Sequence, residues 1–179
     1  MYVKNEEDVR HLIEGGTGNS SYSSAHPDVM PNKFEAGTIN YLGIAGMSAS
    51  LSYIEELGMN NIYKHSVGLV KYCHNKMLDI EEVCMYGGFD WSCRVPVLSF
   101  NIKNVFAFNV GDILNNNNIE IRTGQHCSPL IHKVINTRLH GTCRISIGHK
   151  NNEEEIDEFI DVIKNKVICM KGKNRKKRS

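Results

Sequence analysis

The sequence predicts an α/β fold of the α+β type, in which helices pack on one side of a small mixed or antiparallel sheet and a long helical connector precedes the sheet. Three observations support this prediction. Apolar residues recur at helical spacing over residues 40–57 and 61–78, short β-prone runs begin at residue 82, and a capped amphipathic helix opens at Asn152. The 179 residues, 41% of them apolar, suffice for one ordinary domain with a hydrophobic core.

Two consecutive helices are predicted ahead of the sheet. In residues 40–57 the apolar side chains follow a helical period, and Gly58 is a typical helix stop. In residues 61–78, Leu69 and Cys73 share one apolar face, so Cys73 is expected to fill the core. The two helices are longer than so small a sheet needs for cover. We therefore expect them to pack against other polypeptide and, without it, to leave apolar surface exposed and favour self-association.

The sheet is predicted from short runs of β-forming residues. Residues 82–86 and 95–102 flank a turn that contains Gly87 and Gly88, so they are expected to pair. The following elements are expected in this order: a helix over 109–114, a turn at the asparagine tract 115–118, a strand over 119–122, a helical turn over 129–134 and a strand over 142–147.

The final helix has the clearest pattern. Asn152 and Glu155 have the spacing of a capping box, and acidic residues fill the first turn. The apolar face of this helix is expected to pack on the sheet. It consists of Ile156, Phe159, Ile160, Ile163 and Val167.

Charge is distributed unevenly along the chain. There are 21 basic and 20 acidic residues, but six of the basic residues lie between Lys171 and Arg178. The rest of the chain therefore carries 15 basic and 20 acidic residues, a balance of about −5, and nucleic-acid binding by the folded body is not expected. Residues 169–179 are expected to form a disordered, solvated basic tail.

Targeting signals and metal motifs are not evident. No apolar run approaches the roughly 18 residues of a membrane span, and the charged start lacks a signal-peptide core, so a cytoplasmic protein is expected. The six cysteines form no C-x-x-C pair, so reduced thiols and no metal site are expected.

One loop carries the strongest chemical signal. Residues 121–129 deliver Arg122 from a strand and then present His126 and Cys127 on a glycine-containing loop before a proline. A thiol on a loop tip is accessible, and nearby basic groups favour the nucleophilic thiolate. The alternative for Cys127 is a small core residue, the usual place of a free cysteine.

Arg144 is the second candidate. It stands within an otherwise apolar and small-residue strand, where a charged side chain needs a partner or a cleft. Its planar guanidinium suits a bidentate grip on the carboxylate of an amino-acid substrate. The alternative is a structural salt bridge at a sheet edge.

Four motifs stand in order along the chain: G-G-T-G at 15–18, E-A-G-T at 35–38, R-T-G-Q-H-C at 122–127, and T-C-R at 142–144 followed by the acidic helix start at 153–157. Together they resemble the C-terminal part of the cysteine desulfurase-like enzymes of the class V aminotransferase family, which depend on pyridoxal phosphate. The motifs leave the choice among cysteine, selenocysteine and other amino-acid substrates open.

The resemblance implies roles for four residues. Cys127 would attack the sulfur of a cysteine substrate and accept it as a persulfide while alanine leaves. Arg144 would bind the substrate carboxylate, and Arg122 would help to shape the same pocket. Thr38 would reach across a homodimer to the cofactor phosphate of the other subunit. Ile39 departs from the family, which usually has proline after that threonine.

The cofactor-holding residues of the family are expected to lie outside this sequence. In the family, the Schiff-base lysine, the aspartate that pairs with the pyridine nitrogen and the histidine that stacks on its ring all precede the G-G-T-G segment, and the chain begins too late to contain them. The resemblance thus implies a C-terminal portion that is inactive alone, with a lysine-bearing half or a homodimer mate as partner and a sulfur acceptor protein as a further partner. The alternative is a non-enzymatic sulfur-relay or protein-interaction module.

The expected organisation has four parts. Residues 1–36 are a remnant of the large cofactor domain with an exposed loop, 37–78 are the helical connector, 79–168 are the small α/β domain, and 169–179 are the tail.

Overall fold

The computed structural model describes residues 3–18 and 22–169. The chain divides into two compact units, Met1–Glu56 and Leu57–Ser179, which are described separately. The predicted disordered tail lies outside the described residues, except for Cys169. The four-part organisation expected from the sequence stays a prediction.

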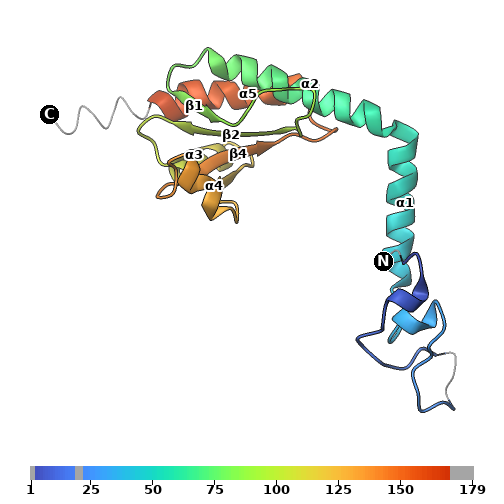
Figure 1. Ribbon diagram of the computed structural model, residues 1–179. Coiled ribbons are helices and arrows are strands. Elements are labelled where there is room, and N and C mark those ends of the chain that lie inside the picture. Colours follow the sequence, from blue (N-terminus) through green and yellow to red (C-terminus); the bar gives the residue numbers. More distant parts are fainter. Residues whose placement is uncertain (1–2, 19–21, 170–179) are drawn as a thin grey trace. The chain divides into compact units, whose positions relative to one another are not determined.

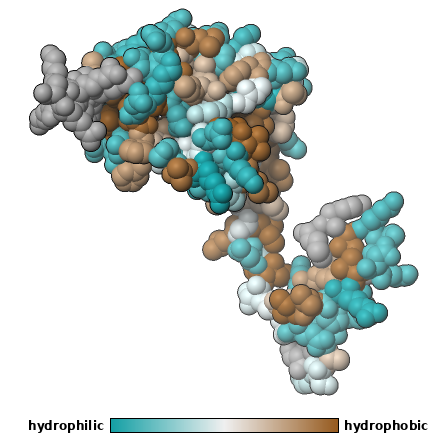
Figure 2. Space-filling model, turned by 60° about the vertical axis from the view of Figure 1, so that its left-hand side comes forward, coloured by the Kyte–Doolittle hydropathy of each residue, from teal (hydrophilic) through white to brown (hydrophobic). Residues whose placement is uncertain are grey.

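The first unit contains two short 3₁₀ helices, Glu6–Asp8 and Asn32–Phe34, and almost all of helix α1 (Tyr41–Leu57). The predicted helix is confirmed, and the Asn40 side chain accepts a hydrogen bond from the Gly43 N–H at its start, at 2.9 Å. No residue of α1 is buried, and hydrophobic side chains are visible along its surface in Figure 2. Large apolar side chains of this helix, among them Leu42, Met47 and Leu51, are exposed.

The second unit is a four-stranded sheet with helices (Figure 1). The strand order is β1-β2-β4-β3, and every neighbouring pair is antiparallel, which confirms an antiparallel sheet. The elements are α2 (Met59–Leu78), β1 (Val83–Tyr86), β2 (Val97–Ile102), α3 (Ala107–Asn115), β3 (Arg122–Gly124), α4 (Pro129–Val134), β4 (Thr142–Ser146) and α5 (Glu153–Val162), which continues as a π-helix over Ile163–Ile168.

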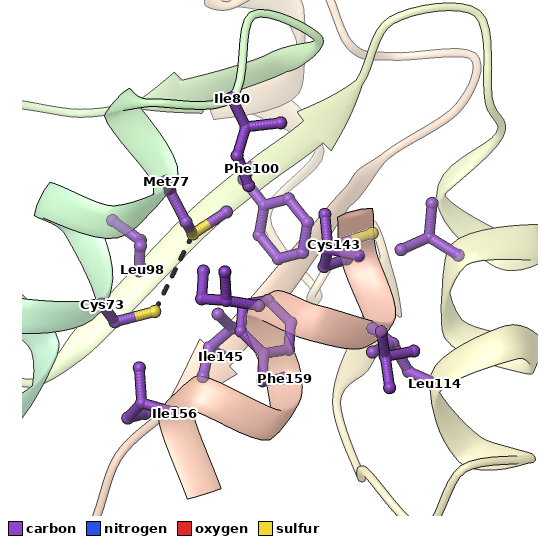
Figure 3. Close-up of a cluster of buried hydrophobic side chains, with 14 of the residues drawn as sticks. Cys73, Met77, Ile80, Leu98, Phe100, Leu114, Cys143, Ile145, Ile156 and Phe159 are labelled. Atoms are coloured by element: carbon purple, nitrogen blue, oxygen red, sulfur yellow. Dashed lines mark hydrogen bonds between the residues drawn. The ribbon is translucent and has the colours of Figure 1, made fainter. Parts of the chain in front are cut away.

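The two faces of the sheet differ in character. Along β2 every second residue is buried, beginning with Leu98 and Phe100, whereas Ser99 and Asn101 point to the opposite face. The buried face packs against α2, α3 and α5, as predicted for helices on one side of the sheet. Phe100 meets Phe159 of α5 edge to face, with ring centroids 5.9 Å apart. Figure 3 shows this core.

Cys73 belongs to that core, as the helical pattern predicted. Its side chain is fully buried on α2, and its Sγ lies 3.8 Å from the Met77 sulfur (Figure 3). Burial raises the pKa of the Cys73 thiol to about 12, so the thiol stays protonated near neutral pH. This cysteine is structural.

The capping box of the final helix is confirmed. The Asn152 side chain accepts a hydrogen bond from the Glu155 N–H at 2.9 Å, and the Glu155 carboxylate accepts one from the Asn152 N–H at 3.2 Å. All five predicted apolar residues of this helix and its π-helical continuation are buried.

The predicted strand over 119–122 is wrong in its bounds, because β3 covers Arg122–Gly124. The Ile119 N–H donates to the Leu114 carbonyl at 3.0 Å, so this residue still belongs to the C-terminal cap of α3. Asn118, in the left-handed region with φ 60°, completes that cap. The chain therefore joins β4 only at Arg122.

No helix in the described part of the chain is both long and apolar enough to cross a membrane.

Candidate functional site

A pocket of about 280 Å³ lies on the polar face of the sheet, opposite the core. Ser99, Thr142 and Arg144 form its floor, because they alternate with core residues on β2 and β4. The other lining residues come from the end of β1, from α4 and from the loop before α4. They are Tyr86, Gly87, His126, Ser128, Ile131, His132 and Ile135.

Arg144 presents an uncompensated cation to this pocket. The register places Arg122 of β3 directly opposite Arg144, so two guanidinium groups face the same side of adjacent strands. The Arg144 Nε is buried and has no hydrogen-bond partner among the described residues. Carboxylates are absent from the pocket lining in the described part of the chain. This arrangement suits an anionic ligand, whose charge would offset the repulsion between the two arginines.

Cys127 is exposed on a strained turn beside the pocket. In residues 125–128 the Ser128 N–H donates to the Gln125 carbonyl at 2.9 Å, and the two central residues, His126 and Cys127, have φ angles of 50° and 58°. Consecutive left-handed residues other than glycine are costly and mark a shape that the surroundings impose. Both neighbours of Cys127 in the chain line the pocket, although Cys127 itself is not among the lining residues.

Two hydrogen bonds anchor this turn to the rest of the unit. The His126 Nε2–H donates to the Thr142 carbonyl on β4 at 3.0 Å. The Gln125 amide donates to the Arg138 carbonyl at 2.8 Å. The thiol is thus held on a defined backbone rather than on a free loop.

The surroundings of His126 favour the neutral form of its imidazole. Burial lowers the pKa of His126, the hydrogen bond to the Thr142 carbonyl raises it, and the neighbouring Arg144 and Arg122 lower it further. A neutral imidazole that donates from Nε2 has its acceptor lone pair on Nδ1. That Nδ1 is buried and unpartnered within the described residues.

Cys127 and Cys143 have opposite environments. Cys143 on β4 points into the core, where burial raises the pKa of its thiol to about 12, and its Sγ lies 3.6 Å from the Ala107 carbonyl oxygen. Cys127 is solvent-exposed. The core alternative for Cys127 is therefore wrong, and the salt-bridge alternative for Arg144 finds no acidic partner among the described residues.

Thr38 belongs to the first unit, whereas Arg122, Cys127 and Arg144 belong to the second. There the E-A-G-T and G-G-T-G motifs lie side by side, because the Gly37 N–H donates to the Gly16 carbonyl at 2.9 Å and Gly15 packs against Ala36. The structure thus brings Arg144 and Arg122 together near the Cys127 turn and describes Thr38 only within its own unit.

Sequence reasoning missed several pocket residues. His132 of α4 is 2% exposed, and its Nδ1 lies 2.7 Å from the Thr137 hydroxyl. Only the tertiary fold brings α4 over the sheet, so no local signal marks His132. Thr142 could have been found, because residues two apart on a strand share a face and Arg144 was already a candidate.

The pocket fits a carboxylate better than it fits an aldehyde cofactor. Its donor groups are a guanidinium, imidazoles and hydroxyls, and no lysine lies among the lining residues that the structure describes. No cluster of three or more His, Cys, Asp or Glu side chains with metal-binding geometry occurs in residues 3–18 and 22–169. The residues present could therefore hold a substrate but not anchor pyridoxal phosphate covalently.

The chain is similar to known proteins over most of its length. A cysteine desulfurase of Wigglesworthia glossinidia brevipalpis is 32% identical over 151 residues, which cover 82% of this chain and 36% of that protein. A cysteine desulfurase of Escherichia coli O127:H6 (strain E2348/69 / EPEC) is 35% identical over 130 residues, which cover 73% of this chain and 31% of that protein. The chain thus spans about a third of the length of these curated relatives.

Solved structures share the fold. The apo structure of a cysteine desulfurase from Thermococcus onnurineus NA1 matches with a TM-score of 0.69 at 33% identity, covering 74% of this chain and 32% of that one. An Escherichia coli cysteine desulfurase in its S-sulfonic acid form matches with a TM-score of 0.66 at 23% identity, covering 75% and 32% of the two chains, and supports the fold alone.

The family comparison covers all four sequence motifs. Residues 1–159 match the family described as aminotransferase class-V, from the G-G-T-G segment of the first unit to helix α5 of the second. The chain belongs to the aminotransferase class-V family.

Proposed function

We propose that this chain supplies the substrate-binding and sulfur-accepting part of a cysteine desulfurase-like site that depends on pyridoxal phosphate. The observation that carries the proposal is the exposed Cys127 on an anchored, strained turn beside a pocket that Arg144 lines, with Arg122 directly opposite Arg144 in the sheet register. The relatives named cysteine desulfurase support the same chemistry.

Arg144 binds the carboxylate of the amino-acid substrate. Its guanidinium has the planar donor geometry that a carboxylate accepts in a bidentate fashion, and its Nε lacks a partner within the described chain. Arg122, directly opposite on β3, adds a second positive charge and shapes the mouth of the pocket.

Cys127 accepts the sulfur. Its thiolate forms an S–S bond to the substrate sulfur as the C–S bond of cysteine breaks, and the carbon takes up a proton. The net reaction converts one thiol and one cysteine into one persulfide and one alanine, so no external oxidant is needed. Pyridoxal phosphate, when bound, supplies the electron sink that makes C–S cleavage accessible.

The cofactor would be held mainly by polypeptide beyond this chain. Thr38 is the candidate for its phosphate, across a homodimer, and the Schiff-base lysine would come from a lysine-bearing partner polypeptide. We propose accordingly that the chain alone does not turn over cysteine, that it works in the cytoplasm, and that a sulfur acceptor protein takes the persulfide.

A sulfur relay is the second candidate. Its supporting observation is the combination of an accessible Cys127 with a pocket that lacks a lysine in its described lining. In this role, Cys127 would receive sulfur from a separate donor enzyme and pass it on, with no cofactor in the chain itself.

The test compares sulfur loading with and without a donor. The purified chain is incubated with pyridoxal phosphate and cysteine, and then with a complete cysteine desulfurase as donor, and persulfide is mapped by peptide mass spectrometry. We expect no sulfide or alanine from the chain alone, and a mass gain of one sulfur on Cys127 with the donor.

Cys127→Ser and Cys93→Ser are matched controls, because both cysteines are exposed. Loading that Cys127→Ser leaves intact would contradict the role of Cys127. Alanine production by the chain alone would contradict the need for a lysine-bearing partner.

A further inference from the structure

A second hollow lies outside the Arg144 pocket, at the edge of the sheet. This edge groove has a volume of about 450 Å³. Residues 118–121, residues 145–147 and the first turns of α5 form its walls and floor. None of its lining residues takes part in the pocket around Arg144.

The groove exists because two antiparallel ladders end at different points. β4 pairs with β2 as far as Ser146 but with β3 only as far as Arg144. Residues 119–121 have a β-prone sequence, yet the cap of α3 holds Ile119 through its N–H bond to the Leu114 carbonyl. Ile145 and Ser146 therefore have a strand neighbour on one side only.

The groove combines an aliphatic floor with an acidic rim. Glu120, before β3, and Glu158, on α5, are exposed lining residues, and neither takes part in an ion pair or side-chain hydrogen bond within residues 3–18 and 22–169. Glu155 also lies at the rim, but its carboxylate caps α5. The apolar lining consists of Ile119, Ile121, Ile145, Ile147, Ile156 and Phe159.

We propose that the edge groove binds an extended peptide of a partner protein in which basic and aliphatic residues alternate. An extended peptide can add to the one-sided edge of β4 through main-chain hydrogen bonds. Side chains alternate along such a peptide, so aliphatic residues face the isoleucine floor while basic residues face Glu120 and Glu158. The charge of the rim favours this peptide over an acidic one.

This inference is independent of the proposed sulfur chemistry, because it uses neither Cys127 nor Arg144.

The experiment measures the binding of synthetic peptides to the full chain by fluorescence anisotropy. The probe is a labelled peptide that alternates lysine and valine, and the comparison peptides are a block-ordered isomer of the same composition and a glutamate–valine analogue. We expect saturable binding of the alternating lysine peptide alone, with amide chemical-shift changes confined to residues 118–121, 145–147 and the start of α5.

Glu120→Gln/Glu158→Gln should weaken that binding about tenfold, since two exposed ion pairs are lost. Glu153→Gln/Glu154→Gln removes the same charge from α5 outside the groove and should leave the affinity within about twofold. Equal losses in the two double variants, equal binding of the block-ordered peptide, or no saturable binding would each overturn the proposal. Circular dichroism of each variant confirms that the fold is retained.

Discussion

The two faces of strand β4 put neighbouring residues into opposite chemical environments. Cys143 points into the hydrocarbon core, where its thiol is held protonated, whereas Arg144 faces the polar pocket with a partly unpartnered guanidinium. Cys143 and Arg144 are adjacent in sequence, yet Cys143 only packs in the core, whereas Arg144 can bind a ligand. The comparison teaches that residue type alone does not identify a functional group, since Cys143 and Cys127 are chemically identical and only their positions differ.

The largest expected difference is in thiol reactivity. Burial raises the pKa of Cys73 and Cys143 from 9.0 to about 12, which lowers their thiolate fraction about a thousandfold at any pH below 9. In the native chain, iodoacetamide should therefore label Cys127 while Cys73 and Cys143 stay unmodified, as measured by time-resolved peptide mapping. If Cys143 were labelled in the folded chain as fast as Cys127, the predicted difference in reactivity between the buried and the exposed thiol would be wrong.

The next largest effect is on stability. Phe100→Ala, on the core face of β2, should lower the free energy of unfolding by about 3–5 kcal/mol, because it leaves a cavity against Phe159. Ser99→Ala, on the pocket face of the same strand, should change it by less than about 0.5 kcal/mol. Urea titrations measure the free energy of unfolding of both variants. If both variants lost a similar amount of it, the pocket face would be packed as tightly as the core.

Removing one arginine of the facing pair should stabilise the fold. Arg122→Gln relieves the repulsion of two like charges on adjacent strands and should raise the free energy of unfolding by about 0.2–1 kcal/mol. Lys103→Gln, an exposed cation away from the pocket, serves as the control. A loss of stability in Arg122→Gln would mean that the arginine pair is structural rather than reserved for a ligand.

The smallest effect is a dependence of stability on pH. The folded-state pKa of His126 lies below its ordinary 6.5, mainly through burial, so the unfolded chain takes up this proton first as the pH falls. His126 thus contributes stability that is present above pH 6.5 and is lost as the pH falls below it. His126→Gln should flatten the decline in unfolding free energy between pH 7 and 5, as measured by urea titrations across that range.

Most helices and strands could be predicted because they depend on patterns among residues that are close in sequence. The helical period around Cys73, the capping box at Asn152 and the β-prone run that ends at Ile102 each depend on residues close in sequence, and the structure confirms all three. The strand over 119–122 was wrong because a longer-range competitor, the α3 cap, holds Ile119. The β-propensity of residues 119–121 gives no information on whether the C-terminal cap of α3 holds Ile119 instead.

The candidate site was predictable only in part. The sequence left Cys127 either exposed on a loop or in the core, and Arg144 either in a cleft or in a salt bridge; the structure exposes Cys127 and places Arg144 in the pocket. The facing position of Arg122 required the strand register, and the presence of His132 required the docking of α4. Both depend on tertiary contacts that no local pattern encodes.

The offset between Cys143 and Arg144 also limits how this segment can change. Because strand side chains alternate, loss of a single residue before β4 that was absorbed by sliding the strand would turn the guanidinium toward hydrocarbon and the inert sulfur toward solvent. Insertions and deletions should therefore be poorly tolerated between Gly141 and Arg144, since each would exchange the two sides of the strand.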